Sequence, residues 1–256
     1  GFPGWHIECT AMSTKYLGKS FDIHTGGIDH IPIHHNNEIA QAEAASGQEL
    51  VRYWLHGAFI GVEGKRIGKS EGNAIRLYQL KERGFNPLAY RYLILTGHYR
   101  SPMNFTWEAL EAAQTALYRA LRIFADLSGT GNISVAAREK FERALKDDLN
   151  TPEAIAVMWE VLKDETLPEG DKRETILLFD RVLGLGFAPS PHGSGIEKLS
   201  VLSESDMPQE VRALLEERNS ARAHGDFAKA DELRTRLSEA GFAVFDTKDG
   251  TELRRN

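Results

Sequence analysis

The sequence predicts three successive parts: an α/β part with a parallel sheet, a bundle of helices, and a small α+β unit at the carboxyl end. In the first part, strand-like apolar runs at residues 21–24 and 58–62 flank a helical run near residues 37–46. This β–α–β alternation is typical of a parallel sheet. Leu and Ala then recur at helical spacing from residue 106 to residue 183. Two further helical runs and an alternating segment at residues 242–254 complete the chain.

Capping residues predict where the helices of the middle part begin. Pro87 suits the first position of a helix that continues to about residue 95. Thr106 and Ser134 have the side chains expected of N-caps, and Thr151-Pro152 starts another helix. The predicted helices cover about residues 87–95, 106–129, 134–146, 151 onward and 173–183. Their apolar stripes indicate a packed core rather than a ligand site.

The carboxyl end is predicted from turn residues. Residues 187–206 are rich in Pro, Ser and Gly, which indicates a linker. Pro208 then opens a helix to about residue 224, and Asp226 caps a second helix that ends at Gly241. Residues 242–246 alternate like a strand and turn back at Asp249-Gly250. This unit has little apolar surface of its own.

Composition and charge narrow the class of protein. The 256 residues are 41% hydrophobic and 27% charged, and no apolar stretch reaches the ~18–20 residues that a membrane span needs. A single cysteine, Cys9, excludes an intrachain disulfide framework and makes a reducing cytoplasm the simplest setting. The net charge of −6 disfavours a generic nucleic-acid binder but leaves room for local basic patches that contact RNA.

A short basic loop follows the second strand-like run. Arg66-Ile67-Gly68-Lys69-Ser70 is closed by Gly72-Asn73. Lys69 offers a flexible point charge, and Ser70 and the backbone N–H groups offer donors, so the loop is suited to gripping a polyphosphate. Taken alone, the motif is more often just an exposed basic turn.

Three potential metal ligands lie upstream of this loop. Cys9, His34 and Glu38 offer a thiolate, an imidazole and a carboxylate, which are three of the four ligands of a tetrahedral zinc site. His34 and Glu38 are four residues apart and therefore share one face of a helix. From the spacing alone, a buried Cys9 and a surface histidine pair remain an alternative interpretation.

Several motifs in a fixed order carry a resemblance to a known family. They are Gly-Trp-His-Ile-Glu-Cys at residues 4–9, Gly-Gly-Ile-Asp at 26–29, His-His-Asn-Asn-Glu at 34–38 and Lys-Ser-Glu-Gly-Asn at 69–73. Asp147-Asp148-Leu149-Asn150-Thr151-Pro152 and the segment around Asp226-Phe227 continue the pattern. The chain resembles cysteinyl-tRNA synthetase, a class I aminoacyl-tRNA synthetase. The resemblance implies the carboxyl-terminal half of a Rossmann-like nucleotide-binding domain, then a helical domain and an anticodon-binding unit.

The resemblance also implies roles for individual residues. Cys9, His34 and Glu38 match the zinc ligands, and zinc would accept the substrate thiolate. Trp5 matches a residue of the amino-acid pocket, although a core tryptophan is an equally good interpretation. Gly27 and Asp29 match the ATP ribose site. Lys69 and Ser70 match the catalytic loop that stabilises the pyrophosphate of ATP, which is used with Mg²⁺.

One part of the family's pattern has no counterpart in this sequence. The family's His-x-Gly-His signature and its early cysteine, the fourth zinc ligand, are absent from these 256 residues. We therefore expect an incomplete and inactive portion of a synthetase, either a truncated product or half of a split enzyme. The proline before His34 is also one position earlier than in the family, at Pro32, which puts the aim of the ligands in question.

The domain division that follows is 1–75 for the catalytic portion with its Lys-Ser loop and 76–105 for a connection to the tRNA stem. Residues 106–186 form the helical domain, 187–206 the linker and 207–256 the anticodon-binding region. The last region has 9 Lys and Arg against 10 Asp and Glu, so it is no simple basic clamp. Its predicted tRNA contacts are Arg222, Asp226, Asp231 and Asp246.

The expected partners are tRNA(Cys), L-cysteine and ATP, for a cytoplasmic, monomeric protein without membrane contact. Two alternatives stay open. One is the related cysteine ligase of mycothiol synthesis, which shares the nucleotide fold and zinc site but joins cysteine to an amino sugar. The other is a non-catalytic tRNA-binding fragment.

Overall fold

The computed structural model describes residues 4–67, 74–188, 207–247 and 250–255. The chain divides into two compact units, one made of Gly1–Asn73 with Gly97–Phe105 and the other of Ala74–Thr96 with Thr106–Asn256. We call them the front unit and the second unit. The finer five-part division stays a prediction. Among the described residues, no helix is both long and apolar enough to cross a membrane.

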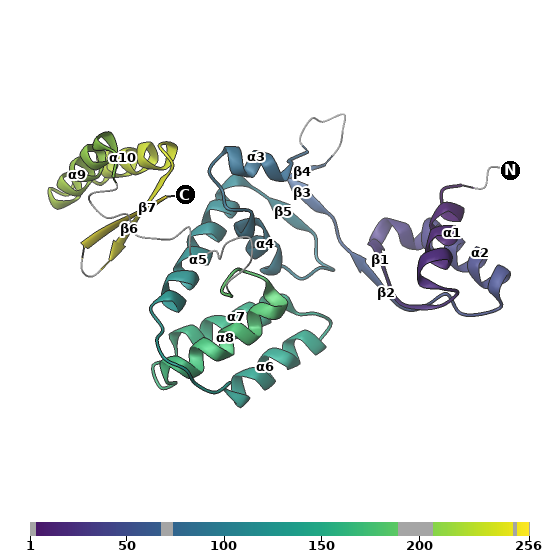
Figure 1. Ribbon diagram of the computed structural model, residues 1–256. Coiled ribbons are helices and arrows are strands. Elements are labelled where there is room, and N and C mark those ends of the chain that lie inside the picture. Colours follow the sequence, from purple (N-terminus) through teal and green to yellow (C-terminus); the bar gives the residue numbers. More distant parts are fainter. Residues whose placement is uncertain (1–3, 68–73, 189–206, 248–249, 256) are drawn as a thin grey trace. The chain divides into compact units, whose positions relative to one another are not determined.

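The front unit contains a β–α–β element. Strand β1 (Phe21–Gly27) pairs in parallel with β2 (Val51–Gly57), and α2 (Asn36–Ser46) connects them through two short helical turns, Ile28–His30 and Ile31–His35. Helix α1 (His6–Leu17) packs against α2 (Figure 1). Gly47 ends α2 with a positive φ of 68°, which favours glycine. The parallel sheet predicted from the sequence is confirmed.

The sequence placed residues 21–24 and 58–62 in one parallel sheet, and that pairing was wrong. Residues 58–62 do not pair with β1; only Ile60–Val62 of that run is a strand, β3, and it belongs to another sheet. There β3 pairs in parallel with β5 (Met103–Phe105) and antiparallel with β4 (Lys65–Arg66). Glu63 and Gly64 both have positive φ, as a two-residue hairpin turn requires. The true partner, β2, carries Arg52, Tyr53 and Trp54 and lacks a clear alternation of apolar residues.

The second unit begins with helices whose predicted starts are largely confirmed. Asn86, Thr106, Ser134 and Asn150 each accept a backbone N–H as the N-cap of their helix. The helices are α3 (Leu77–Glu82), α4 (Pro87–Leu95), α5 (Trp107–Ala125), α6 (Val135–Lys146), α7 (Thr151–Lys163) and α8 (Glu169–Leu183). Helix α8 starts four residues before the predicted position 173, and α5 ends four residues before 129.

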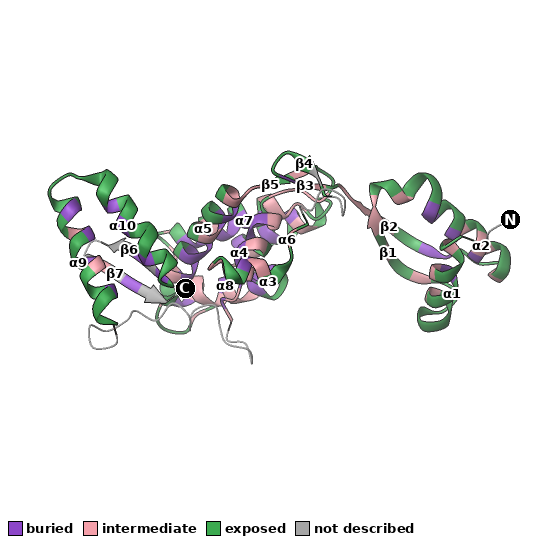
Figure 2. Ribbon diagram, turned by 90° about the horizontal axis from the view of Figure 1, so that it is seen from above, coloured by how far each residue is buried: buried purple, intermediate pink, exposed green. Residues whose placement is uncertain are grey.

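The core of the second unit is apolar and well packed. Phe141 and Phe179 stack with ring centroids 4.0 Å apart, and Phe124 meets Phe187 edge to face. Buried segments recur along α4, α5 and α7, whereas α1 of the front unit is almost entirely exposed (Figure 2). Asp180, a buried carboxylate on α8, accepts hydrogen bonds from the backbone N–H groups of Leu185 and Ala188. Its polar group is thereby satisfied, as burial requires.

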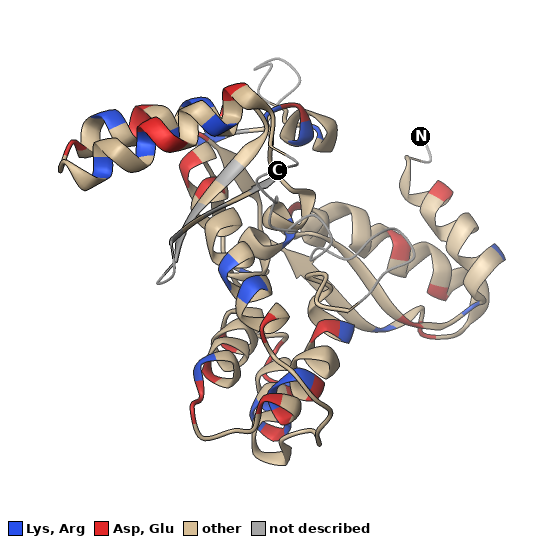
Figure 3. Ribbon diagram, turned by 60° about the vertical axis from the view of Figure 1, so that its left-hand side comes forward, with Lys and Arg blue, Asp and Glu red and all other residues tan. Residues whose placement is uncertain are grey.

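The carboxyl end of the second unit has its own small core. Helices α9 (Gln209–Ala223) and α10 (Phe227–Glu239) pack together and are followed by the antiparallel hairpin of β6 (Phe242–Thr247) and β7 (Gly250–Arg255). Buried residues from all four elements form one apolar cluster: Val211, Leu215, Leu237, Phe242, Val244 and Leu253. Both signs of charge alternate along the two helices (Figure 3). The predicted helix pair and hairpin are confirmed.

Candidate metal and nucleotide site

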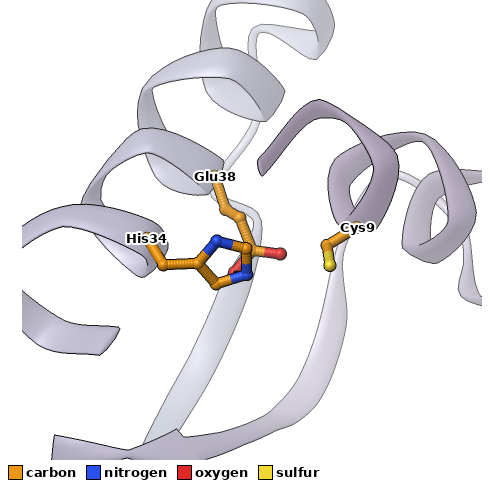
Figure 4. Close-up of side chains that lie close together, drawn as sticks. All are labelled: Cys9, His34 and Glu38. Carbon is orange, nitrogen blue, oxygen red and sulfur yellow. The ribbon is translucent and has the colours of Figure 1, made fainter. Parts of the chain in front are cut away.

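Three segments of the front unit bring Cys9, His34 and Glu38 together. Cys9 lies on α1, His34 on the helical turn before α2, and Glu38 in the first turn of α2. One ligand atom from each residue lies within 4.8 Å of the others, and the Cys9 sulfur faces the Glu38 carboxylate (Figure 4). His34 and Glu38 are both buried. The earlier position of Pro32 therefore does not prevent these groups from converging.

Glu38 is the centre of this group. Its side chain is only 1% exposed, and its Oε2 lies 3.1 Å from His24 Nε2 and 3.8 Å from the Nε2 atoms of His34 and His35. Its other oxygen, Oε1, is buried and has no hydrogen-bond partner among the described residues. A buried carboxylate oxygen without a partner is costly. The arrangement is therefore that of a group with one oxygen left for a cation.

The protonation of the neighbouring groups follows from burial. Burial raises the pKa of the Cys9 thiol, and the nearby carboxylates of Glu38 and Glu8 raise it further. Burial also lowers the pKa of His34, against the opposing pull of Glu38. At neutral pH, His34 is the neutral imidazole that metals bind, whereas Cys9 must lose a proton to become a ligand. A sulfur, a nitrogen and an oxygen donor suit Zn²⁺.

A cluster of histidines surrounds this group. Among the described residues, six histidines take part: His6, His24, His30, His34, His35 and His56. His35 lies in the same cluster: its Nδ1 lies 2.8 Å from His56 Nε2, and burial with four neighbouring imidazoles lowers its pKa to about 4. The sequence reasoning missed His6, His24, His30 and His56. The available signal was the crowding of six histidines into the first 56 residues.

The predicted nucleotide residues lie at the end of β1. Gly27 is the last residue of the strand, and Asp29 is exposed on the helical turn Ile28–His30. A Cβ on Gly27 would meet Asp29 Oδ1, a contact that the exposed Asp29 side chain can relieve by moving. Ligands of open parallel sheets bind at this end of the strands. Lys69 and Ser70 lie outside the described residues.

Comparison with known proteins covers almost the whole chain. Residues 1–115 match the profile of the tRNA synthetases class I (C) catalytic domain, residues 140–164 a DALR domain, and residues 204–254 the cysteinyl-tRNA ligase anticodon binding domain. Cysteine–tRNA ligase 1 of Burkholderia lata is 47% identical over 254 residues, or 99% of this chain. Cysteine–tRNA ligase of Opitutus terrae is 40% identical over 257 residues.

The chain belongs to the cysteine–tRNA ligase family. It spans 52% of the length of each of these two relatives. Among solved structures, the LeuRS of Agrobacterium radiobacter K84, in a ternary complex with tRNA and LeuAMS, matches 66% of this chain with a TM-score of 0.53. At 20% identity and 26% coverage of that longer chain, this likeness shows the fold alone. The class I synthetase fold predicted from the sequence is thereby confirmed.

Within this member of the cysteine–tRNA ligase family, Trp5 lies beside the candidate metal group. Its side chain is 54% exposed, and its ring meets that of His34 edge to face at 4.4 Å. The alternative of a core tryptophan is therefore wrong for the described structure. An exposed indole next to the three ligands is compatible with a pocket wall, and that role stays a prediction.

Three of the four predicted tRNA contacts, Arg222, Asp226 and Asp231, occupy surface positions. Asp226 caps α10, because its Oδ1 accepts the backbone N–H of Lys229 at 3.1 Å. Arg222 and Asp231 are exposed on α9 and α10, and Asp246 lies opposite Thr251 in the hairpin. The capping role of Asp226 is confirmed, whereas contact with RNA is untested for all four.

Proposed function

We propose that the complete protein joins L-cysteine to tRNA(Cys) through a cysteinyl-adenylate made from ATP with Mg²⁺. The convergence of Cys9, His34 and Glu38 beside the end of β1 carries this proposal, together with the family membership. The site sits where open α/β sheets bind nucleotides, so an amino acid held there would lie next to ATP.

The three converging side chains would hold zinc. They fit because the buried Glu38 Oε1 lacks a partner and because the donor set combines sulfur, nitrogen and oxygen. Bound zinc would supply a soft acceptor for the substrate thiolate, which separates cysteine from serine better than the ~1–3 kcal/mol of an apolar pocket. The roles left to this chain's other residues are binding and orientation of the two substrates.

Other residues would position the substrates. Trp5 would close one side of the amino-acid pocket, and its half-exposed ring can move without disturbing the core. Because Gly27 has no side chain, the ribose of ATP could approach the backbone closely there. The Asp29 carboxylate could then accept hydrogen bonds from the ribose hydroxyl groups. Lys69 and Ser70 would stabilise the departing pyrophosphate.

The exchange of pyrophosphate into ATP tests this function. The full-length protein should catalyse the exchange with cysteine and fail with serine. Cys9→Ser should lose zinc and most of the exchange. Exchange driven by another amino acid, or an unchanged Cys9→Ser protein, would overturn the assignment. Residues 1–256 alone should be inactive, because they contain no His-x-Gly-His segment to contact the other side of ATP.

The anticodon-binding role belongs to residues 207–256. The match of residues 204–254 to an anticodon binding domain favours tRNA over the small amino-sugar acceptor of the mycothiol-type ligase. Polar side chains such as Arg222, Asp226, Asp231 and Asp246 would read splayed bases. Deleting 207–256 from the full-length protein should leave cysteine-dependent exchange nearly intact and sharply weaken tRNA charging. Charging that survives the deletion would contradict the anticodon-binding role of residues 207–256. Exchange without any tRNA charging by the full-length protein would favour the mycothiol-type ligase, whereas tRNA binding without exchange would favour a non-catalytic protein.

A further inference from the structure

Two histidines outside the predicted ligand set each contact one of the predicted ligands. His24 Nε2 lies 3.1 Å from Glu38 Oε2, and His6 Nδ1 lies 2.8 Å from His34 Nδ1. The contact from His6 occupies Nδ1 of His34 and leaves Nε2 for a metal. The contact from His24 occupies Oε2 of Glu38 and leaves Oε1, the oxygen without a partner. One atom on each of these two ligands, His34 Nε2 and Glu38 Oε1, therefore remains available for a metal ion.

We propose that His24 is a positioning residue for the metal site, donating its Nε2–H to Glu38 Oε2 so that Oε1 points at the ion. This inference rests on the zinc site of the proposed function. A hydrogen bond to the outer oxygen fixes the rotation of the carboxylate, and partners of this kind raise metal affinity by 10–100-fold in metalloproteins generally. Without His24, Glu38 would be free to rotate and to present either oxygen.

The surroundings of His24 hold its imidazole in place. It lies on β1, and aromatic rings pack around it at centroid distances of 5.7 Å for Phe21, 4.8 Å for Trp54 and 4.9 Å for His35. The pairing of β1 with β2 sets this arrangement, since His24 is in register with Trp54. A donor fixed by a strand and by neighbouring rings loses little entropy when it binds the carboxylate, as a positioning group requires.

A rival role for His24 is that of a ligand. His24, His35 and Glu38 also have ligand atoms within 4.8 Å of one another, which describes a second metal group. That group shares Glu38 with the first, and its available nitrogen on His35 is Nε2, since His35 Nδ1 lies at hydrogen-bond distance from His56. Filling it would remove the hydrogen bond that leaves Oε1 free. The positioning role therefore predicts one metal ion for this chain, and the ligand role predicts two.

Metal titration of the 256-residue chain separates these roles, because it contains Cys9, His34 and Glu38. Zn²⁺ affinity would be measured by competition with a chromophoric chelator, and Co²⁺ absorption would report the ligand geometry. His24→Gln keeps an N–H donor near the position of Nε2, whereas His24→Asn is polar but too short to reach Glu38. His30→Asn is the matched control, since His30 belongs to the cluster and no described hydrogen bond joins it to the three ligands.

We expect one Zn²⁺ per chain. His24→Asn should bind it 10–100-fold more weakly and with an altered Co²⁺ spectrum. His24→Gln and His30→Asn should stay within about threefold of the unaltered chain. Equal affinity in the Gln and Asn variants, or two ions in the unaltered chain that fall to one in His24→Asn, would overturn the positioning role. Unaltered zinc binding in Cys9→Ser would instead refute the metal site itself, so the two failures are distinguishable.

Discussion

The front unit and the helical part of the second unit place their polar and apolar side chains in opposite ways. In the helices, large side chains such as Phe124, Phe179 and Leu183 are fully buried. In the front unit, Glu38, His34 and His35 are buried, while Trp5 and other large apolar side chains stay exposed: Ile7, Met12, Tyr16, Ile23, Ile33 and Tyr53. Among the described residues of the front unit, a small apolar cluster joins α2 to β2, with Ala42, Leu50 and Val51 at its centre.

This difference indicates that the two parts obtain their stability differently. Burying apolar area stabilises the helical bundle outright, at roughly 25 cal/mol per Å². Burying a carboxylate among imidazoles costs free energy unless hydrogen bonds or a cation compensate it. The front unit therefore has a buried polar cluster at the position where the helical bundle has an apolar core, and this cluster costs stability as long as it lacks a compensating partner. The following predictions test that difference, from the largest effect to the smallest.

The helical part should respond most strongly to the loss of a core ring. Phe179 is fully buried and stacks on Phe141, so Phe179→Ala should reduce the free energy of unfolding by about 3–5 kcal/mol. Urea unfolding followed by circular dichroism measures this change. Ile23→Ala, at a front-unit side chain that is 58% exposed, is the control and should cost well under 1 kcal/mol. Similar losses in the two variants would contradict the comparison.

Acid should weaken the metal-free front unit before the helical part. Burial holds the pKa of His35 at about 4, below its ordinary value of 6.5. Between pH 6.5 and pH 4 the unfolded chain binds a proton that the folded chain does not, so stability falls as the pH is lowered through this window. The full shift corresponds to a loss on the order of 3 kcal/mol. Hydrogen exchange of the front-unit amides at pH 7 and pH 4 measures it.

A matched substitution identifies the group responsible for this acid sensitivity. His35→Gln removes the titrating imidazole and should flatten the pH dependence of exchange in α2 and β2. The amides of α5 and α7 serve as an internal reference and should change little over the same range. If His35→Gln retains the full dependence, other histidines of the cluster account for it.

Zinc should stabilise the front unit selectively. A ligand that binds only the folded state adds RT ln(1 + [L]/Kd), or about 2.7 kcal/mol at a free concentration of 100 Kd. Hydrogen exchange should therefore slow in α1, α2 and β1 when Zn²⁺ is added and stay unchanged in α7 and α8. Cys9→Ser is the control and should abolish the protection. Uniform protection of both parts would show that zinc acts elsewhere.

The same contrast explains what the sequence could predict. Helix starts at Thr106, Ser134 and Asp226 were predictable because a cap is a local signal, read from one side chain and the few residues after it. The partner strand of β1 was not, because pairing joins distant segments and Arg52-Tyr53-Trp54 carries no clear period of two. Local sequence patterns therefore predicted the helical part more completely than they predicted the sheet of the front unit.

The residues of the candidate site also differ in how far a local sequence signal could predict them. Cys9, His34 and Glu38 could be named because their motifs resemble a family and because two of them share a helical face. The roles of His6, His24 and His56 could not, because three separate segments carry them and only the fold brings them together. The register that sets His24 opposite Trp54 and Gly26 opposite His56 is a tertiary property. Predicting it requires the correct partner strand first.

The smallest expected effect concerns Asp226, for which a helix cap and a tRNA contact make different predictions. Its Oδ1 accepts the Lys229 N–H, so Asp226→Ala should cost about 1 kcal/mol, whereas Asp226→Asn keeps a good cap and should cost almost nothing. Ser134→Ala removes an equivalent cap from α6 and is the matched control for stability. If capping is the whole role of Asp226, the Asn variant of the full-length protein also binds tRNA(Cys) with unchanged affinity. Weaker tRNA binding at unchanged stability would instead assign the carboxylate to the RNA contact, because Asn keeps the cap but loses the charge.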